Sequence, residues 1–388
     1  MLLIHLVGCT QTPRGGSSIK PGAERISEYV ELLNNKRVAV VANQTSLIGK
    51  THLVDSLLVL GVNIVKVFGP EHGFRGKAGA GEKVINSKDT KTGLQIISLY
   101  GKHKKPTPED LESVDVVIFD IQDVGVRFYT YISTLTYVME ACAENNTGLV
   151  ILDRPDPHGS YIDGPVLESG FSSFVGMHRV PVVHGMTVGE YAQMVNGEGW
   201  LKNGVQCNLR VIKIKNYTHN SFYKLPVPPS PNLPNMSAIE LYPSLCFFEG
   251  TIISVGRGTD MPFQIIGHPD FKQGTYSFTP VDKPGVAMNP KYEGEKCFGL
   301  DLSGYADSIE REKRLDLRWL ISMYNYFKGK DKFFNSFFDK LAGTDKLRKQ
   351  IAAGLSENEI RQSWKPQLTE FNKIRKKYLL YPDFDDKQ

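Results

Sequence analysis

The stretch Val62-Asn63-Ile64-Val65-Lys66-Val67-Phe68-Gly69-Pro70-Glu71-His72-Gly73-Phe74-Arg75-Gly76 joins a strand-like run to a loop dense in polar groups. Its first six residues have the length and β-branched content of a buried strand. Gly69 and Pro70 end the run, and a carboxylate, an imidazole and a guanidinium follow at once in Glu71, His72 and Arg75. Polar groups gathered on a loop at a strand end usually carry function, whereas a surface turn would leave them solvated. We expect a functional loop.

Apolar runs and helical patterns alternate on both sides of this stretch. Strands are expected at residues 38–42, 62–67, 94–99, 114–119 and 148–152. Helices are expected at 23–34, at 51–60 with Thr51 as the N-cap, at 107–111, at 130–145, and after Thr187 with Glu190 completing a capping box. Near-continuous apolar strands separated by helices predict a doubly wound, mostly parallel α/β sheet.

The second half of the chain has a different pattern. Residues 226–234 contain five prolines, which exclude a helix or a central strand and predict a rigid extended segment between domains. Strands are expected at 208–214, at 250–255 before a glycine-rich loop, and at 296–302, and helices at 315–327, 330–342 and 356–380. We therefore divide the chain into a segment 1–21, a domain 22–205, and a smaller α+β domain 206–388.

Four of the expected strands end in polar residues. These residues are Asn43 after the first strand, Glu71 and His72, then Asp120, Gln122 and Asp123, and finally Asp153 and Arg154. Ligands of open α/β sheets bind at the carboxyl ends of the strands, near the switch in strand order. The sequence therefore predicts a site at this edge of the sheet.

The side chains at this edge suit a polar, hydroxyl-rich and anionic ligand. Glycoside hydrolysis needs one carboxylic acid to protonate the leaving oxygen and usually a second group as nucleophile or base. The candidate catalytic residues are Glu71, His72, Asp120 and Asp123. The candidate substrate-binding residues are Asn43, Arg75, Gln122, Arg127, Tyr129, Asp153, Arg154, His184, Asn232 and Arg257. An arginine among them could hold a substrate carboxylate with two hydrogen bonds.

Several other classes of site are not supported by the motifs. The sequence has no dinucleotide-binding glycine motif after the first strand, no Walker-type phosphate loop, no G-x-S-x-G and no H-E-x-x-H. The scattered carboxylates Asp120, Asp123 and Asp153 could surround an ion together with His72, but acids of this kind more often pair with arginines. We expect neither a metal nor a cofactor.

Composition and charge are those of an ordinary globular protein. The 388 residues are 41% hydrophobic and 23% charged, with a net charge of +4. The one basic cluster, at 373–377, is read as the solvated face of a helix, so nucleic-acid binding is not expected. Cys142, Cys207, Cys246 and Cys297 have no metal or redox spacing and are expected to be buried free thiols.

The N-terminus has a separate signature. Residues 1–9 are apolar and end in Leu-Val-Gly-Cys, which resembles the lipobox of bacterial lipoproteins, although no Lys or Arg precedes the run. Residues 10–23 then form a polar tether. We expect an exported protein of the periplasm or the membrane surface, whose membrane contact is limited to a lipid on Cys9.

Ordered sequence blocks resemble those of the bacterial exo-β-N-acetylmuramidase family. They are VANQTS (41–46), GPEHGFRG (69–76), FDIQDVGVRFYTY (119–131), LDRP (152–155), DGPVL (163–167), HGMTVGE (184–190), SPNLP (230–234) and EGT (249–251) followed by GRGTD (256–260). The resemblance covers about residues 25 to 385, essentially the mature chain.

The resemblance implies a Rossmann-like N-terminal domain, a smaller C-terminal domain and an active cleft between them. It implies release of non-reducing-terminal N-acetylmuramic acid (MurNAc) from peptidoglycan fragments, with Glu71 as the acid/base and no cofactor. The substrate's own N-acetyl group could act as the nucleophile, with Asp120 or Gln122 orienting it. A surface lipoprotein that binds muropeptides or sugars without turnover is the alternative.

Overall fold

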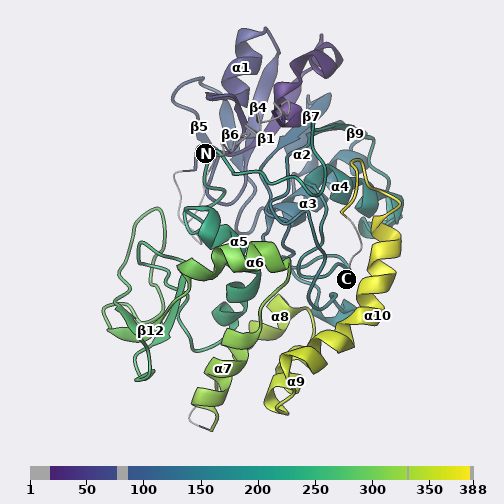
Figure 1. Ribbon diagram of the computed structural model, residues 1–388. Coiled ribbons are helices and arrows are strands. Elements are labelled where there is room, and N and C mark those ends of the chain that lie inside the picture. Colours follow the sequence, from purple (N-terminus) through teal and green to yellow (C-terminus); the bar gives the residue numbers. More distant parts are fainter. Residues whose placement is uncertain (1–17, 77–85, 330–331, 385–388) are drawn as a thin grey trace, which may run out of the picture.

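The computed structural model describes residues 18–76, 86–329 and 332–384. Figure 1 shows that the molecule has two parts, one above the other in this view. The lipobox and Cys9 lie outside these residues. The upper part of Figure 1 is a seven-stranded sheet flanked by helices, and the lower part is mainly helical with a small sheet. No helix in the described part of the chain is both long and apolar enough to cross a membrane.

The large sheet has the strand order β5-β6-β4-β1-β7-β8-β9. Its strands are β1 (Val38–Ala42), β4 (Ile64–Gly69), β5 (Ser87–Lys88), β6 (Gln95–Ser98), β7 (Val116–Asp120), β8 (Gly148–Leu152) and β9 (Leu209–Ile212). All pairs are parallel except the short edge strand β5 against β6. Without β5 this is the Rossmann order, with the switch between β1 and β7. The prediction of a mostly parallel, doubly wound sheet is confirmed.

Helices cover both faces of the sheet, which explains its apolar strands. They are α1 (Leu53–Val59), α2 (Pro108–Leu111), α3 (Tyr131–Glu144) and α4 (Val188–Gly197). Alternate side chains of β1 point to opposite faces, so that Val38 and Val40 pack in the cluster that contains α1, while Ala39 and Val41 pack in the cluster that contains α3. α4 begins with the capping box expected between Thr187 and Glu190.

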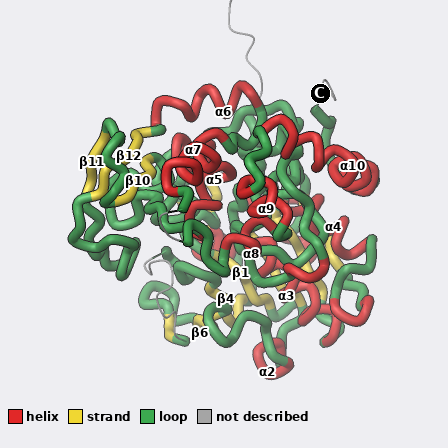
Figure 2. The backbone as a smooth tube through the Cα atoms, turned by 90° about the horizontal axis from the view of Figure 1, so that it is seen from below, coloured by secondary structure: helices red, strands yellow, loops and turns green. Residues whose placement is uncertain are grey.

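The C-terminal part holds a three-stranded antiparallel sheet and a set of helices, as expected for a smaller α+β domain. The sheet is formed by β10 (Ile265–His268), β12 (Cys297–Asp301) and β11 (Tyr276–Phe278), in that order. The helices are α5 (Met236–Leu245), η6 (Cys246–Gly250), η7 (Ser303–Tyr305), α6 (Ala306–Glu312), α7 (Arg318–Phe327), α8 (Phe338–Ala342), α9 (Lys346–Ala352) and α10 (Glu357–Arg375). Figure 2 shows the small sheet on one side of the molecule and α10 on the other.

The two parts of the chain are interleaved. β9 extends the large sheet beyond residue 205, where the sequence placed the end of the N-terminal domain. The segment after α10 returns to the N-terminal domain, where the Leu380 amide donates to Glu190 and the His219 amide donates to the Pro382 carbonyl oxygen. The Tyr381 hydroxyl donates to the Asp153 carboxylate at 2.5 Å.

Several local predictions were wrong. Residues 23–34 form three 3₁₀ turns, η1 (Gly22–Glu24), η2 (Ile26–Glu28) and η3 (Val30–Leu33), instead of one helix. The backbone leaves helical geometry at Arg25 and Tyr29, where the buried Tyr29 hydroxyl donates to the Ala23 carbonyl oxygen. Thr51 does not cap α1, because it pairs with Ile48 in the hairpin β2 (Leu47–Ile48) and β3 (Thr51–His52). The N-cap is His52, whose Nδ1 accepts from the Val54 amide.

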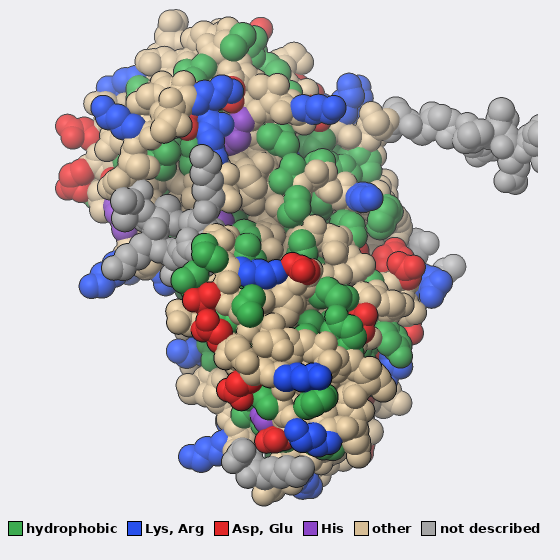
Figure 3. Space-filling view, turned by 90° about the vertical axis from the view of Figure 1, so that its left-hand side faces the viewer, with side chains coloured by type: hydrophobic (Ala, Val, Ile, Leu, Met, Phe, Trp, Pro, Cys, Tyr) green, Lys and Arg blue, Asp and Glu red, His purple; other side chains and the backbone are tan. Residues whose placement is uncertain are grey.

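Two further differences lie in the C-terminal part. Residues 250–255 form no strand, but make single bridges from Thr251 to Phe334 and from Ser254 to Gly267. The helix expected at 330–342 is confined to α8 within the described residues of that range. Short η4 (Ser169–Phe171) and η5 (Lys202–Gly204) turns complete the fold. Acidic and basic side chains are interspersed over the described surface on the face shown in Figure 3.

Candidate active site

The loop after β4 holds Glu71 on the wall of a cavity of about 240 Å³ between the two domains. The Thr130 hydroxyl donates to Glu71 Oε2 at 3.2 Å, and the Tyr131 hydroxyl lies 3.4 Å from the Glu71 carbonyl oxygen. Thr130 is the N-cap of α3, so the carboxylate sits near the positive end of that helix. The loop and the start of α3 therefore fix the Glu71 carboxylate at the carboxyl edge of the sheet.

His72 occupies a strained and buried position next to Glu71. Its φ of +69° lies in the left-handed region, which non-glycine residues seldom adopt and which often marks functional sites. Its Nε2 lies 3.2 Å from Ser230 Oγ in the proline-rich segment. The imidazole lines the cavity and contacts both domains.

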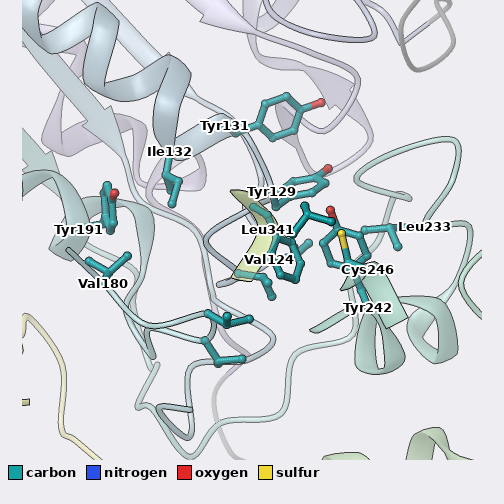
Figure 4. Close-up of a cluster of buried hydrophobic side chains, with 14 of the residues drawn as sticks. Val124, Tyr129, Tyr131, Ile132, Val180, Tyr191, Leu233, Tyr242, Cys246 and Leu341 are labelled. Carbon is teal, nitrogen blue, oxygen red and sulfur yellow. The ribbon is translucent and has the colours of Figure 1, made fainter. Parts of the chain in front are cut away.

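Tyr129, Tyr131 and Tyr242 line the cavity and form its tyrosine wall. Figure 4 shows these three side chains near one another. The rings of Tyr129 and Tyr131 meet edge to face at 5.0 Å, and Tyr242 of α5 approaches Tyr129 at 6.0 Å. Burial raises the pKa of each of these phenols above its usual value, so the hydroxyls remain protonated. A wall of tyrosines offers both apolar faces and hydrogen-bonding hydroxyls to a sugar.

The proline-rich segment closes another side of the cavity. The Tyr129 hydroxyl donates to the Pro229 carbonyl oxygen at 2.8 Å, and Gln44 Nε2 donates to the same oxygen at 3.1 Å. Asn232 Nδ2 donates to the Val286 carbonyl oxygen at 2.7 Å, while its buried Oδ1 has no partner in the described part of the chain. Asn232 is among the residues that line the cavity, although this oxygen is itself buried.

Arg257 and Glu249 line the cavity from the C-terminal domain. Arg257 Nε donates to Glu249 Oε1 at 2.6 Å. Five predicted site residues are thus brought together here, namely Glu71, His72, Tyr129, Asn232 and Arg257. The other nine are not among the described residues that line the cavity, and most of them support the edge of the sheet from behind.

Asp120 and Arg154 form a buried ion pair. Arg154 Nε and Nη2 donate to the two Asp120 carboxylate oxygens at 2.6 and 2.8 Å, and both side chains are almost inaccessible. Arg75 is engaged in the same manner, because it donates to both oxygens of Asp89 and to Asp55. Both guanidinium groups are therefore held by protein carboxylates.

Arg127 and Asp153 connect distant segments. The two Arg127 Nη atoms donate to the carbonyl oxygens of Pro165, Val180, Leu341 and Ala342 at 2.8–2.9 Å, and burial lowers the pKa of the guanidinium to about 9. Asp153 accepts from the Thr187 and Tyr381 hydroxyls and from the Gly189 amide, and burial raises its pKa to about 7. Both residues join the two domains.

The remaining predicted residues are buried at the strand ends. Gln122 Nε2 donates to the carbonyl oxygens of Asp123 and Pro155, which leaves it no amide hydrogen for a substrate N-acetyl group. Asp123 Oδ2 accepts from the Gly125 amide, and burial raises the pKa of Asp123 to about 7. Asn43 Oδ1 accepts from Thr45. His184 is fully buried, and burial lowers its pKa to about 3.

Sequence reasoning assigned no role to several residues that line the cavity, among them Glu249, Ser230, Thr130, Tyr131 and Tyr242. Glu249 did carry a signal, because it is a single charge that follows the apolar run 245–248. The cysteines are free and buried, as expected. Within residues 18–76, 86–329 and 332–384, no three His, Cys, Asp or Glu side chains are grouped as metal ligands would be.

The fold and the cavity define the class of protein. A Rossmann-like sheet supplies a carboxylate to a cavity between two domains, and tyrosines and a paired arginine enclose it, as in a glycoside hydrolase with a small polar substrate. The family description "Exo-beta-N-acetylmuramidase NamZ" matches the chain in two parts, the N-terminal part over residues 38–237 and the C-terminal part over residues 240–381. The chain belongs to the exo-β-N-acetylmuramidase NamZ family, as the sequence blocks predicted.

Individual relatives cover nearly the whole chain. The peptidoglycan β-N-acetylmuramidase NamZ of Bacillus subtilis (strain 168) is 39% identical over 376 residues, which are 92% of this chain and 89% of that protein. A solved DUF1343 family structure from Bacteroides fragilis is 47% identical with a TM-score of 0.88, covering 95% of this chain and all of that one. A second from the same organism is 30% identical with a TM-score of 0.77, covering 94% and 99%.

Proposed function

We propose that this chain is an exo-acting glycoside hydrolase that releases non-reducing-terminal MurNAc from peptidoglycan fragments such as MurNAc-GlcNAc. The 39% identity to a peptidoglycan β-N-acetylmuramidase over 92% of the chain carries the proposal. The exo mode rests on the description of the matching family, "Exo-beta-N-acetylmuramidase NamZ".

Glu71 is the proposed general acid. Its carboxylic acid form would give its proton to the glycosidic oxygen as the bond to the anomeric carbon breaks, and its carboxylate would then take a proton from the attacking water. Within the described residues, Thr130 is the one side chain that hydrogen-bonds to this carboxylate, so the second oxygen can face the substrate. Asn232 and the tyrosines would contact the sugar ring.

The test is the release of free MurNAc from MurNAc-GlcNAc by the chain lacking residues 1–17. This truncation keeps the bridge between Lys20 and Lys215. Release of the monosaccharide would support the proposal. Calorimetric binding of the disaccharide without release would instead support the binding lipoprotein, and the absence of both would contradict each function. Turnover that is lost in EDTA and restored by a divalent ion would contradict a mechanism without metal.

We also propose that the protein is exported and is anchored through a lipid on Cys9. The motif at residues 6–9 supports this. In a bacterial expression host, the full chain should fractionate with membranes, whereas Cys9→Ser should be found in the soluble fraction. Equal distribution of the two chains would contradict the anchor.

A further inference from the structure

Arg257 is held by an unusually constrained turn. It lies between Gly256 and Gly258, whose φ angles are +76° and +80°. A Cβ atom at Gly256 would come within 2.5 Å of Ile265 Cγ1, and one at Gly258 within 2.6 Å of the Val281 carbonyl oxygen. Both positions therefore need glycine on two counts, backbone conformation and space. The turn fixes where the side chain of Arg257 begins.

The guanidinium itself is held from two directions. Its Nε donates to Glu249 Oε1 at 2.6 Å, and its central carbon lies over the Phe263 ring, 5.0 Å from the ring centroid. Phe263 is itself fixed, because it is 1% exposed, has a φ of +55° and packs edge to face on Tyr242 at 4.9 Å. The position of the charge is thus set before any ligand binds.

The rest of the guanidinium remains available. The Arg257 side chain is 28% exposed, and its two Nη atoms have no hydrogen-bond partner among the described residues. A second cavity of about 270 Å³ shares Glu249 and Arg257 with the first, so the group lies between two open spaces. On the far side, the Lys291 ammonium donates to the carbonyl oxygens of Phe248, Thr251 and Ile253, and is therefore occupied.

Arg257 also differs from the other arginines considered as carboxylate ligands. Arg75 and Arg154 pair with protein carboxylates, and Arg127 donates to four carbonyl oxygens. Of the described residues that line the tyrosine-walled cavity, Arg257 is the only arginine or lysine. A ligand carboxylate in this cavity therefore has one guanidinium within reach.

We propose that Arg257 binds the carboxylate of the lactyl ether on the substrate's MurNAc, and thereby selects MurNAc over N-acetylglucosamine. This inference rests on the proposed function. Glu71 and Arg257 approach the cavity from different domains, so a sugar bound between them can present its anomeric carbon to one and its C3 lactyl group to the other. The two free Nη atoms match the two oxygens of a carboxylate. Glu249 acts as a positioning residue for the guanidinium.

The experiment compares three 4-nitrophenyl β-glycosides, which share one leaving group. They are the glycoside of MurNAc, the same compound with its lactyl carboxylate converted to the primary carboxamide, and the glycoside of N-acetylglucosamine. The full-length chain, Arg257→Met and Arg257→Lys are assayed on each. Arg348→Met is the matched control, because Arg348 also pairs with a carboxylate of the C-terminal domain, at Asp339, but does not line the cavity.

The wild type should prefer the acid over the carboxamide by about 100-fold in kcat/KM, the value of a charge-assisted bidentate contact. Arg257→Met should lose most of this factor on the acid and change little on the carboxamide, with Arg257→Lys in between and Arg348→Met unchanged. Equal losses on the acid and the carboxamide would overturn the proposal, since a structural or catalytic role predicts parallel losses on both substrates. A wild type without preference would also overturn it.

The role of Arg257 can still be tested if the chain proves not to be a hydrolase. If the wild type releases nitrophenol from none of the glycosides, the hydrolase is contradicted, and binding of free MurNAc and of N-acetylglucosamine is then measured by calorimetry. A preference of the wild type for MurNAc that disappears in Arg257→Met would still support the carboxylate site. Equal affinities of the wild type and the variant for MurNAc would overturn it.

Discussion

Two sets of polar residues lie at the same edge of the sheet. They differ in how many of their hydrogen-bonding atoms have partners within the protein. The cavity wall consists of Glu71, His72, Tyr129, Asn232 and Arg257, and the buried polar layer behind it consists of Asp120, Arg127, Asp153 and Arg154. In the buried polar layer, protein partners occupy both oxygens of Asp120 and both Nη atoms of Arg127. In the cavity wall, Asn232 Oδ1 and the Nη atoms of Arg257 have no partner among the described residues.

This difference shows that residue type and strand-end position cannot by themselves distinguish catalytic or binding residues from residues that stabilise the fold. A buried charge must be paired, so a sheet edge that carries catalytic groups also needs ionic groups that hold its loops. A place on the cavity is the feature that distinguishes the two sets, since Arg127 Nε in the buried polar layer also has no partner among the described residues but does not line the cavity. Changes in the cavity wall should therefore affect turnover, and changes in the buried polar layer should affect stability.

Glu71→Gln should give the largest effect. Removing a general acid should lower kcat/KM on MurNAc-GlcNAc by about 1,000-fold, within the 10²–10⁴ range of such catalysis, because glutamine cannot give up a proton. Calorimetric affinity for the disaccharide and the melting temperature should both persist. Glu144→Gln, at an exposed partner of Lys105, is the control and should keep full turnover. Full turnover by Glu71→Gln would show that the acid lies elsewhere.

Asp120→Asn should destabilise the fold by about 3 kcal/mol, because it leaves the buried Arg154 charge unpaired. Asp115 offers a close comparison, since it also accepts two side-chain hydrogen bonds from one arginine, Arg37, but at the surface, where the Arg37 amide adds a third. Asp115→Asn should cost much less than Asp120→Asn, because water screens an exposed ion pair. Denaturant unfolding measures both values. Similar losses in the two variants would remove the distinction between buried and exposed pairs.

Asp153 should make stability depend on pH. Burial raises its folded pKa to about 7, above the value near 4 of an unfolded aspartate. The native state then retains a proton that the unfolded chain releases, so this residue's contribution to the free energy of unfolding falls as the pH rises from about 4 to 7. The slope is at most about 1.4 kcal/mol per pH unit. Relative to the wild type, Asp153→Asn should gain stability over this range. Parallel curves for the two chains would contradict the assignment.

Tyr129→Phe should have the smallest effect. It removes one hydrogen bond to the Pro229 carbonyl oxygen, which Gln44 continues to satisfy, so the loss of stability should be about 1 kcal/mol. Because the proline-rich segment also carries Asn232, KM should rise more than kcat falls. Steady-state kinetics and thermal unfolding on the same samples test this. A larger loss of kcat than of substrate affinity would place the Tyr129 hydroxyl in the chemistry.

Much of the fold was predictable because its strands are buried on both faces. The runs at 38–42, 116–119 and 149–152 are apolar without interruption, and a covered parallel sheet buries every one of these residues except the partly buried Val116. The turns at 22–33 were not predictable in this way, since their apolar spacing fits a helix and the contacts that interrupt it involve distant residues. The Gly22 amide, for example, donates to the Asp153 carbonyl oxygen.

The sequence predicted which edge of the sheet holds the site, but not which of the polar residues there line the cavity. Strand-end position located Glu71 and His72 correctly on the cavity, yet placed Asp120 and Arg154 in the same group, although each is the other's partner. Which carboxylate pairs with which arginine depends on the relative positions of backbone segments that are far apart in the sequence. A local sequence pattern does not specify those positions. Glu249 was overlooked for the same reason, because its relation to Arg257 arises only when the turn after residue 255 folds back over α5 and η6.

The returning segment at residues 378–384 has a consequence for biosynthesis. The ribosome makes these residues after every segment that they contact, and until they arrive the Asp153 carboxylate lacks Tyr381 and the Glu190 carboxylate lacks the Leu380 amide. The strands of the Rossmann-like sheet are therefore translated well before two of the buried carboxylates beside it receive all their partners. A nascent chain stopped short of residue 378 would present incompletely paired acids to chaperones and proteases.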